Sequence, residues 1–485
     1  MLTAREPKNV FRFFEEISRI PRGSGNEKGV SDYLIAFAQS RGLWFHRDDA
    51  LNVVVKKPGT KGMESAPPVI LQGHMDMVCE KNAGVAHDFE KDPLRLIVDG
   101  DFLRADGTTL GADNGAALAL ALAALDGDDL AHPPLEALFT SGEETGLLGA
   151  AKVDGALFEG RLLINLDSGE EGFFCACCAG GARVDLSYAP EYRDLPPGHV
   201  VKTLTVDGLK GGHSGMDIAK ERANANRLMG RALGILRAKQ GVHLVAINGG
   251  SKENAIPRDA RADVALPAAK DRALADEVER IGETFRREYA ASDAGLRFRL
   301  EEGRAESASR AFAPATSAGV VAALLLLPNG VQAMSATLKG LPETSLNIGV
   351  VTTTENGVVI SSCLRSSVGS RKAMLLDQAN AVAEVTGARV SVSGLYPEWE
   401  YNADSALRKK AMDVFAKTFG KEAQVHGTHG GLECGILGEK IPGADIVSFG
   451  PDIHEMHSPN EKMSIPSFGR TWTFLTKLLA ALGGP

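Results

Sequence analysis

The chain has 485 residues and a formal net charge of −9, with 44% hydrophobic and 24% charged residues. This length suits two or three domains, and the composition is ordinary for a soluble globular protein. Because no basic, aromatic-rich stretch occurs, we expect no nucleic-acid partner. Because no apolar run approaches ~20 residues and the N-terminal stretch lacks a signal-peptide core, we expect no membrane partner and a cytoplasmic location.

Cysteine usage also indicates a reducing compartment. The six cysteines are Cys79, Cys175, Cys177, Cys178, Cys363 and Cys434, too few to staple a chain of this length. A thiolate metal site at FFCACCAGG is an alternative for Cys175, Cys177 and Cys178. No second Cys/His pair has zinc-finger spacing, so this run is better interpreted as a buried strand.

The first part of the chain alternates apolar strands with helical stretches. We expect strands at 52–55, 69–71, 135–139 and 162–166, and a helix over the Ala-rich segment 116–125. Strands that alternate with helices favour an α/β fold with a mainly parallel sheet.

The pattern changes after about residue 183. A strand at 200–206, the glycine-rich turn GLKGGHSG and a helix at 223–239 come first. A strand–strand–helix–strand unit then occurs twice, at 242–247, 261–266, 270–289 and 296–300, and at 346–351, 357–363, 372–386 and 389–392. A helix at 405–419 and a strand at 446–449 follow. We therefore predict a catalytic domain in two pieces, 1–183 and 393–485, interrupted by an inserted α+β lid domain at 184–392.

Histidines and carboxylates follow the ends of the expected strands. VILQ leads into His74 and Asp76, LEALFT into Glu143 and Glu144, LLINL into Asp167, and IVSFG into a loop with His457, while Asp113 precedes the Ala-rich helix. Ligands of open α/β sheets bind beyond the carboxyl ends of the strands. The recurrence of these residue types at one edge indicates a site there.

The residue types in this set suit metal ions. Imidazole and carboxylate ligands bind zinc and its neighbours, and two close ions need a shared carboxylate with further ligands on each side. We expect two divalent ions to be bound by His74, Asp113, Glu144, Asp167 and His457. Zinc is the expected metal, with manganese or cobalt as alternatives. A helical H-E-x-x-H motif at His454 and His457 is one residue short and follows a strand.

These segments resemble the M20 family of metallopeptidases, in its aminoacyl-histidine dipeptidase branch. The matching segments are GHMDMV, DGTTLGADNG, SGEETGLLGA, INLDS, GGHSGMDI, ENAIP, GLECG and HSPNE, in this order over nearly the whole chain. The resemblance implies a di-metal peptidase catalytic domain with an inserted lid.

Roles for single residues follow from the same resemblance. It implies that Asp113 bridges both ions, that His74 and Asp167 complete one site, and that Glu144 and His457 complete the other. Asp76 would hold the His74 imidazole in place, and Glu143 would be the general base. The family also has an unusual peptide bond after the bridging aspartate, where Asn114 stands.

The lid residues have implied roles as well. His213 would stabilise the oxyanion, and Asn254 and Arg365 would contact the substrate carboxylate, with Arg258 and Arg371 as alternatives to Arg365. Glu433 is a candidate contact for the free amine of the substrate. The resemblance also implies a homodimer formed through the lid domain.

The expected function is therefore a di-metal aminoacyl-histidine dipeptidase that hydrolyses small unblocked dipeptides, including β-alanyl-histidine, with metal-activated water. A related M20 amide hydrolase, either an N-acyl amino acid deacylase or a tripeptidase, is the nearest alternative. A non-catalytic scaffold of the same fold is the alternative from another class. An intact Glu143 and a complete ligand set argue against that scaffold.

Overall fold

The computed structural model describes residues 5–127, 130–303 and 309–484. Two compact units are present. Unit 1 runs from the N-terminal part of the chain to Cys178 and resumes over Trp399–Thr428 and from Leu432 onward. Unit 2 comprises Ala179–Glu398 and His429–Gly431.

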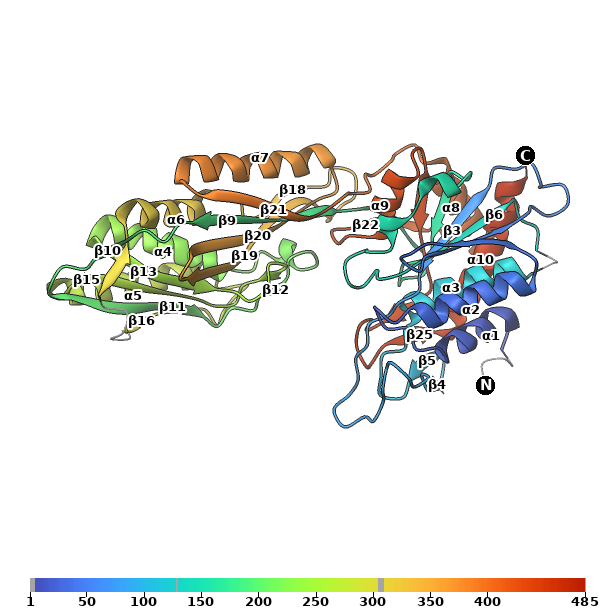
Figure 1. The fold of residues 1–485 in the computed structure, drawn as a ribbon, viewed down its shortest axis with the longest axis horizontal. Coiled ribbons are helices and arrows are strands. Elements are labelled where there is room, and N and C mark those ends of the chain that lie inside the picture. The colour runs from blue at the N-terminus through green and yellow to red at the C-terminus, as the bar shows by residue number, and fades with distance from the viewer. Residues whose placement is uncertain (1–4, 128–129, 304–308, 485) are drawn as a thin grey trace. The chain divides into compact units, whose positions relative to one another are not determined.

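Unit 1 is built on an eight-stranded mixed sheet with the order β1-β2-β6-β3-β7-β23-β8-β22 (Figure 1). The strands in this order are Trp44–Arg47, Val53–Lys57, Leu135–Thr140, Val69–His74, Leu162–Asn165, Asp445–Ser448, Phe173–Cys178 and Gln424–Thr428. The central strands β6, β3, β7 and β23 are mutually parallel. The pairs β1–β2, β2–β6 and β23–β8 are antiparallel. The carboxyl ends of the four central strands therefore meet at one edge.

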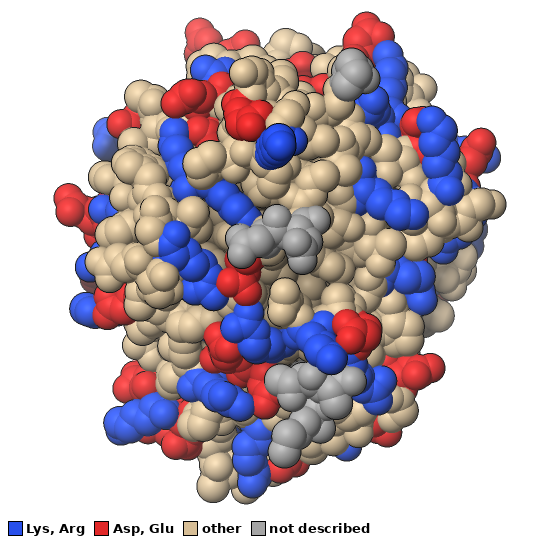
Figure 2. All heavy atoms as spheres, turned by 90° about the vertical axis from the view of Figure 1, so that its right-hand side faces the viewer, with Lys and Arg blue, Asp and Glu red and all other residues tan. Residues whose placement is uncertain are grey.

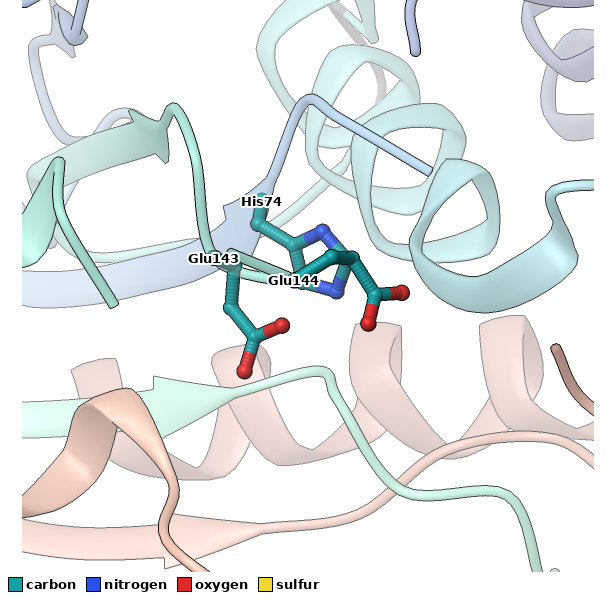
Figure 3. Close-up of side chains that lie close together, drawn as sticks. All are labelled: His74, Glu143 and Glu144. Carbon is teal, nitrogen blue, oxygen red and sulfur yellow. The ribbon is translucent and has the colours of Figure 1, made fainter. Parts of the chain in front are cut away.

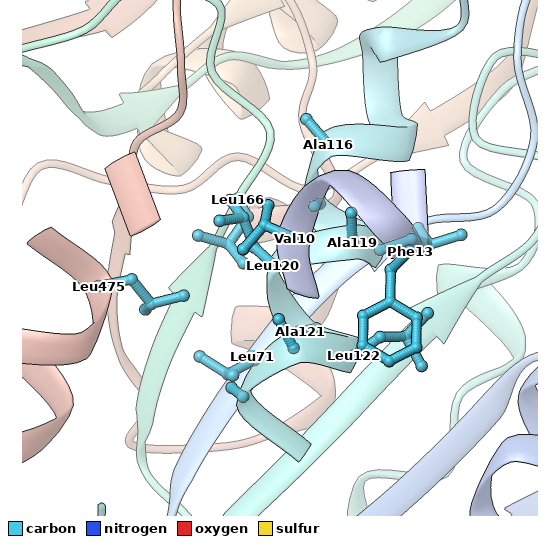
Figure 4. Packing of buried hydrophobic residues seen from close by; sticks show 14 of the residues in the cluster. Val10, Phe13, Leu71, Ala116, Ala119, Leu120, Ala121, Leu122, Leu166 and Leu475 are labelled. Atoms are coloured by element: carbon cyan, nitrogen blue, oxygen red, sulfur yellow. The ribbon is translucent and has the colours of Figure 1, made fainter. Parts of the chain in front are cut away.

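Helices cover this sheet. They are α1 (Lys8–Ser18), α2 (Lys28–Ser40), α3 (Ala112–Asp126), α8 (Ala406–Phe419), α9 (Glu433–Lys440) and α10 (Ile465–Gly483). Helix α3 is buried along nearly its whole length, and Leu120 and Leu122 pack there with Val10 of α1 and Leu71 of β3 (Figure 4). This burial explains the Ala-rich sequence, since small side chains let a central helix approach its neighbours closely. A smaller antiparallel sheet has the order β24-β25-β5-β4, with strands Ile453–His454, Lys462–Ser464, Phe102–Ala105 and Leu96–Asp99.

Unit 2 contains a nine-stranded antiparallel sheet with the order β16-β11-β15-β13-β19-β20-β9-β21, and β18 pairs with β19. The strands are Arg297–Glu302, His199–Asp207, Ala260–Pro267, His243–Gly249, Pro342–Thr354, Gly357–Ser366, Gly180–Tyr188 and Arg389–Tyr396, with β18 at Gly330–Met334. Two small ribbons join β10 (Tyr192–Asp194) to β17 (Arg310–Phe312) and β12 (Gly212–His213) to β14 (Ala255–Ile256). The helices α4 (Ala225–Gln240), α5 (Asp271–Glu288), α6 (Pro314–Leu326) and α7 (Gly369–Thr386) share one hydrophobic core with this sheet (Figure 1).

The predicted repeat is present in unit 2. Its first copy is β13, β15, α5 and β16, and its second is β19, β20, α7 and β21. Each final strand joins the sheet beside a strand from outside its copy, because β16 pairs with β11 and β21 pairs with β9. The predicted domain boundaries after residues 183 and 392 lie inside β9 and β21. The compact units divide at Cys178 and Glu398.

The surface and the helices bear on possible partners. On the face shown in Figure 2, the described Lys and Arg side chains are interspersed with Asp and Glu side chains. Within the described parts of the chain, no helix combines the length and the apolar character needed to cross a bilayer.

Candidate metal centre

Five predicted ligands converge at the carboxyl edge of the unit 1 sheet. His74 ends β3, Glu144 follows β6, Asp167 follows β7, Asp113 lies in the first turn of α3, and His457 lies in the loop after β24. These chain segments are far apart in the sequence, and the parallel strands bring their ends together. Gly73 allows the close approach of β3 to α3, since a Cβ there would lie 2.4 Å from Ala117 Cβ.

Asp113 presents its two carboxylate oxygens to two different histidines. Its Oδ1 lies 3.0 Å from His74 Nε2, and its Oδ2 lies 3.1 Å from His457 Nε2. Asp167 Oδ1 lies 3.6 Å from the same His74 nitrogen, and Glu144 Oε1 lies 3.2 Å from the same His457 nitrogen. The result is two groups, His74–Asp113–Asp167 and Asp113–Glu144–His457, that share one carboxylate.

The donor set fits metal ions. Zinc sites in proteins commonly use imidazole nitrogen and carboxylate oxygen at about 2.0–2.2 Å from the ion. These are the atom types gathered here. Glu144 Oε1 is buried and makes no hydrogen bond, although His457 Nε2 lies 3.2 Å from it, so a cation between the two side chains would satisfy it. Among the described residues, the groups able to hold a metal contain only His, Asp and Glu. Cys175, Cys177 and Cys178 are instead buried in β8.

Asp76 links the ligand His74 to the segment that carries both glutamates. Its Oδ1 lies 3.4 Å from His74 Nδ1 and accepts a hydrogen bond from Glu143 N–H, while its Oδ2 accepts one from Glu144 N–H. The pKa of Asp76 is lowered to about 2, because hydrogen bonds from His74 and Glu143 outweigh its burial. A carboxylate therefore remains at this position at neutral pH.

Glu143 and Glu144 lie close to His74 (Figure 3), and the three side chains form a third group in which the ligand atoms lie within 4.8 Å of one another. Burial raises the pKa of Glu143 to about 9, with Asp167, Glu433 and Glu144 adding to the rise and His74 opposing it. The excess of buried negative charge is thus unfavourable without cations, and bound cations would lower this pKa. A carboxylate beside a metal pair can act as a general base.

Comparison with known proteins decides the family. The model of peptidase family M20/M25/M40 matches residues 70–481. The chain belongs to this family. It is 38% identical over 478 residues to the cytosol non-specific dipeptidase of Escherichia coli, covering 99% of this chain and 98% of that protein. Its fold matches the crystal structure of aminoacylhistidine dipeptidase from Vibrio alginolyticus with a TM-score of 0.93 and 38% identity, covering 99% and 98% of the two chains.

A more distant solved structure shares the fold alone. The aminopeptidase PepT from Bacillus cereus is 15% identical, with a TM-score of 0.57 and coverage of 98% and 99% of the two chains. The predicted family, the predicted α/β fold and the predicted assignment as a metal-dependent peptide hydrolase are confirmed. The two full-length relatives support a dipeptidase of the M20 family.

In this M20 chain, Glu433 is fully buried at the start of α9. Its Oε2 accepts hydrogen bonds from Gln72 Nε2 and Thr140 Oγ1, both 2.6 Å away, and its Oε1 has no donor. Burial raises its pKa to about 7, with His74 and Thr140 opposing the rise. The unpartnered oxygen is compatible with a cationic ligand, although no part of the side chain is exposed.

The predicted lid residues lie in unit 2. The β12–β14 ribbon pairs His213 with Ala255 and so places Asn254 beside the GGHSG segment, where its carbonyl accepts a hydrogen bond from Ser214 N–H. Arg365 is buried in β20 and donates to Tyr396 Oη at 3.0 Å, and its Nε has no acceptor. The alternative Arg371 is half-exposed and pairs with Glu343, and Arg258 is exposed.

The peptide bond between Asp113 and Asn114 is cis, at the position where the resemblance implies an unusual bond. Asn114 is also buried within the ligand set. Its Nδ2 donates to Asp167 Oδ1 at 3.0 Å, and its Oδ1 accepts from His74 N–H at 3.1 Å. Asn114 therefore connects two ligands that come from different strands.

Several residues around the ligands were not predicted from the sequence. Arg22, Ser24 and Glu27 lie between α1 and α2, and Glu461 lies four residues after His457. The signal for Glu461 was the HSPNE segment, where the sequence suggested a role only for the histidine. For Arg22 the pattern offered no signal, because a charged residue in a loop is normally solvated.

Proposed function

We propose that the protein is a dipeptidase that uses two divalent metal ions, held by His74 and Asp167 on one side of Asp113 and by Glu144 and His457 on the other. The observation that carries the proposal is the division of the two Asp113 oxygens between two histidines. A carboxylate shared in this way is what a pair of ions about 3.5–4 Å apart requires.

The proposed reaction assigns a proton route to Glu143. Two divalent ions, when bound, would polarise the scissile carbonyl and lower the pKa of the attacking water. Glu143 takes the proton from that water and passes it to the departing amine. Asp76 keeps the His74 ring in place through Nδ1 and holds the backbone of both glutamates.

Recognition of the substrate termini is assigned to other residues. We assign the substrate carboxylate to Arg365 and Asn254, because Arg365 is a buried guanidinium with an unused N–H donor. His213 is assigned to the oxyanion. Glu433 is assigned to the free amine on the basis of its unpartnered Oε1. These assignments each require a free terminus of the substrate, as an unblocked dipeptide has.

We propose the substrate and the location by analogy with the relatives, and the metal from the types of ligand. An Xaa-His dipeptide such as β-alanyl-histidine is the proposed substrate, as the name of the Vibrio alginolyticus protein suggests for that protein. Zinc is the proposed metal, with manganese or cobalt as alternatives for a nitrogen and oxygen ligand set. A cytoplasmic location is proposed because the Escherichia coli relative is a cytosol dipeptidase.

A homodimer through unit 2 is also proposed. Strand β21 is an edge strand of the nine-stranded sheet, and Val392 and Leu395 on it are exposed, as is Val385 of α7. Exposed apolar residues beside an unpaired edge favour pairing with another chain. Sedimentation should show a dimer for the wild type and a monomer for Leu395→Lys, and a monomeric wild type would contradict this assignment.

A substrate panel tests the proposed function. Free dipeptides, N-acetylated amino acids and tripeptides should be compared with and without a chelator. Chelator-sensitive hydrolysis of free dipeptides alone is expected. Preference for N-acetylated amino acids would indicate a deacylase, preference for tripeptides would indicate a tripeptidase, and absence of hydrolysis would indicate a scaffold.

A further inference from the structure

The loop between α1 and α2 contacts three of the segments that carry metal ligands or the general base. Arg22 Nη1 donates to the carbonyls of Met75 at 2.9 Å and Asp76 at 3.0 Å, directly after His74. Its Nη2 donates to the carbonyl of Gly111, two residues before Asp113. One guanidinium therefore ties the His74 segment to the Asp113 segment.

Two more side chains of this loop reach other parts of the site. Ser24 Oγ donates to Asp76 Oδ2 at 2.8 Å. Glu27 Oε1 accepts a hydrogen bond from Gly142 N–H at 3.0 Å, immediately before Glu143. Glu27 is buried, so these N–H and carboxylate groups satisfy each other away from water.

Glu461 connects the loop of His457 to the segment of Asp113. Its Oε2 accepts from Leu110 N–H and Gly111 N–H, both at 2.9 Å, and its Oε1 accepts from Asp113 N–H at 3.2 Å. Glu461 belongs to the loop that carries His457, so it fixes this loop against the segment of the shared carboxylate. Charge-assisted bonds of this kind are about twice as strong as neutral ones.

Arg22 and Glu461 carry opposite charges, and both residues are buried, each about 2% exposed. Burial lowers the pKa of Arg22, and the carboxylates of Glu461, Asp76 and Asp113 oppose this effect. Burying a charge is costly unless it is paired and hydrogen-bonded. Here the nearby opposite charges and the hydrogen bonds to backbone groups of the ligand segments offset this cost.

The chain also makes room for the guanidinium. A Cβ at Gly115 would lie 2.7 Å from Arg22 Nη2, and one at Gly111 would lie 2.6 Å from the same atom. Both glycines flank Asp113 in the segment GADNG. The space around the shared carboxylate is thus shaped for an arginine whose hydrogen bonds go to backbone carbonyls.

We infer that Arg22 and Glu461, with Ser24 and Glu27, are positioning residues that hold the ligand segments in place before metal binds. Arg22 fixes His74 relative to Asp113, and Glu461 fixes His457 relative to Asp113. The inference rests on the proposed two-metal site. Its specific content is that metal affinity depends on a loop that supplies no ligand.

Lysine cannot replace this arginine. The guanidinium offers a planar fork whose two ends reach acceptors on different segments, whereas an ammonium is a single point charge on a flexible stem. Glutamine cannot replace Glu461 either, because its amide nitrogen cannot accept the N–H that the second carboxylate oxygen accepts. Arg22→Lys and Glu461→Gln therefore remove the hydrogen bonds that connect two segments, while Arg22→Lys keeps the charge and Glu461→Gln keeps the side-chain volume.

The test is cobalt titration of the full-length protein, followed by visible absorption and calorimetry. Arg22→Met, Arg22→Lys and Glu461→Gln should weaken cobalt binding about tenfold to a hundredfold and change the absorption bands. Circular dichroism should remain that of the wild type.

Matched controls exist for both charges. Arg408 is a buried arginine that donates to the carbonyl of Ala403, so Arg408→Met removes a comparable group away from the ligand segments. Glu136 is a buried carboxylate that accepts from Glu159 N–H and Gly160 N–H and also pairs with Lys56 Nζ at 2.7 Å, so Glu136→Gln is the control for the loss of a buried carboxylate. Both controls should bind cobalt with wild-type affinity and spectrum.

The outcomes separate the two claims. Wild-type cobalt affinity and spectrum in both Arg22→Met and Glu461→Gln would overturn the positioning role while leaving the metal site intact. An equal loss of cobalt affinity in the two controls would also overturn the positioning role, because the loss of any buried charge would then weaken metal binding. Failure of the wild type to bind cobalt would instead overturn the proposed function. Should Arg22→Met fail to fold, Ser24→Ala provides a milder variant, with a smaller loss of affinity expected and none contradicting the inference.

Discussion

His457 Nε2 lies 3.1 Å from Asp113 Oδ2, although 344 residues separate the two in the chain. The whole of unit 2 is inserted between them. The second group of ligands therefore forms only when the chain returns to unit 1 after that insertion. This relationship joins the discontinuous architecture to the metal chemistry.

Glu143→Gln should abolish most turnover without loss of metal. The amide cannot take a proton from water, so kcat should fall about 10²–10⁴-fold. Metal analysis of the same sample should match the wild type, because Glu143 belongs to neither group that shares Asp113. Glu439→Gln, at an exposed position of α9, is the control. Near wild-type kcat in Glu143→Gln would refute the assignment of the base.

Arg365→Ala should weaken the use of free dipeptides. A charge-assisted hydrogen bond contributes ~1.5–3 kcal/mol, so kcat/KM should fall about tenfold to a hundredfold. Arg371→Ala removes a nearby arginine that already pairs with Glu343 and should leave kcat/KM unchanged. The assignment fails if Arg371→Ala has the larger effect, since Arg371 was an alternative from the sequence.

His429 should make the stability of the protein fall in mild acid. Burial lowers its pKa to about 4, and Arg365 adds to the effect, while its Nε2 lies 2.7 Å from Ser345 Oγ. Between pH 6.5 and 4 the unfolded chain binds a proton at this histidine that the folded chain does not bind. The free energy of unfolding therefore decreases by ~1.4 kcal/mol for each pH unit in this range.

The comparison of wild type with His429→Gln isolates this contribution. The difference between their free energies of unfolding should change by ~2 kcal/mol between pH 6.5 and 5, to the disadvantage of the wild type. Urea titrations at both pH values measure it. A pH-independent difference would show that His429 is protonated equally in both states.

Gly115→Ala should weaken metal binding in the presence of Arg22 but less in its absence. Alanine favours a helix by ~1 kcal/mol over glycine, so the substitution alone would be stabilising. The new Cβ would lie 2.7 Å from Arg22 Nη2 and displace the guanidinium. Gly438→Ala in α9, whose Cβ would meet nothing closer than 3.5 Å, is the control.

A double-mutant cycle measures the coupling. The loss of cobalt affinity caused by Gly115→Ala should be smaller in an Arg22→Met background than in the wild type. Equal losses in both backgrounds would mean that the clash with Arg22 is not the cause.

The sequence predicted the elements whose residues follow a clear period. The repeat in unit 2 and strands β3, β6 and β7 were predicted at nearly their observed positions. The prediction of a mainly parallel sheet is confirmed, but which pairs are antiparallel (β1–β2, β2–β6 and β23–β8) depends on tertiary pairing and has no signal in the sequence. The predicted boundaries after residues 183 and 392 lie inside β9 and β21, whereas the compact units divide at Cys178 and Glu398.

The convergence of the five candidate ligands was predictable because each of them follows a buried strand or precedes a buried helix. Residues that act through backbone groups were not predictable in this way. Arg22 and Glu461 hold carbonyls and N–H groups of distant segments, so neither periodicity nor spacing indicates their role. Contacts of this kind are defined by the packed structure.

The stoichiometry of metal binding in His457→Ala tests the two-metal account most directly. Elemental analysis should find two ions per chain in the wild type and one in His457→Ala, since only the group with Glu144 loses a ligand. His454→Ala, three residues away, should retain two. Two ions in His457→Ala, or loss of an ion in His454→Ala, would contradict the account.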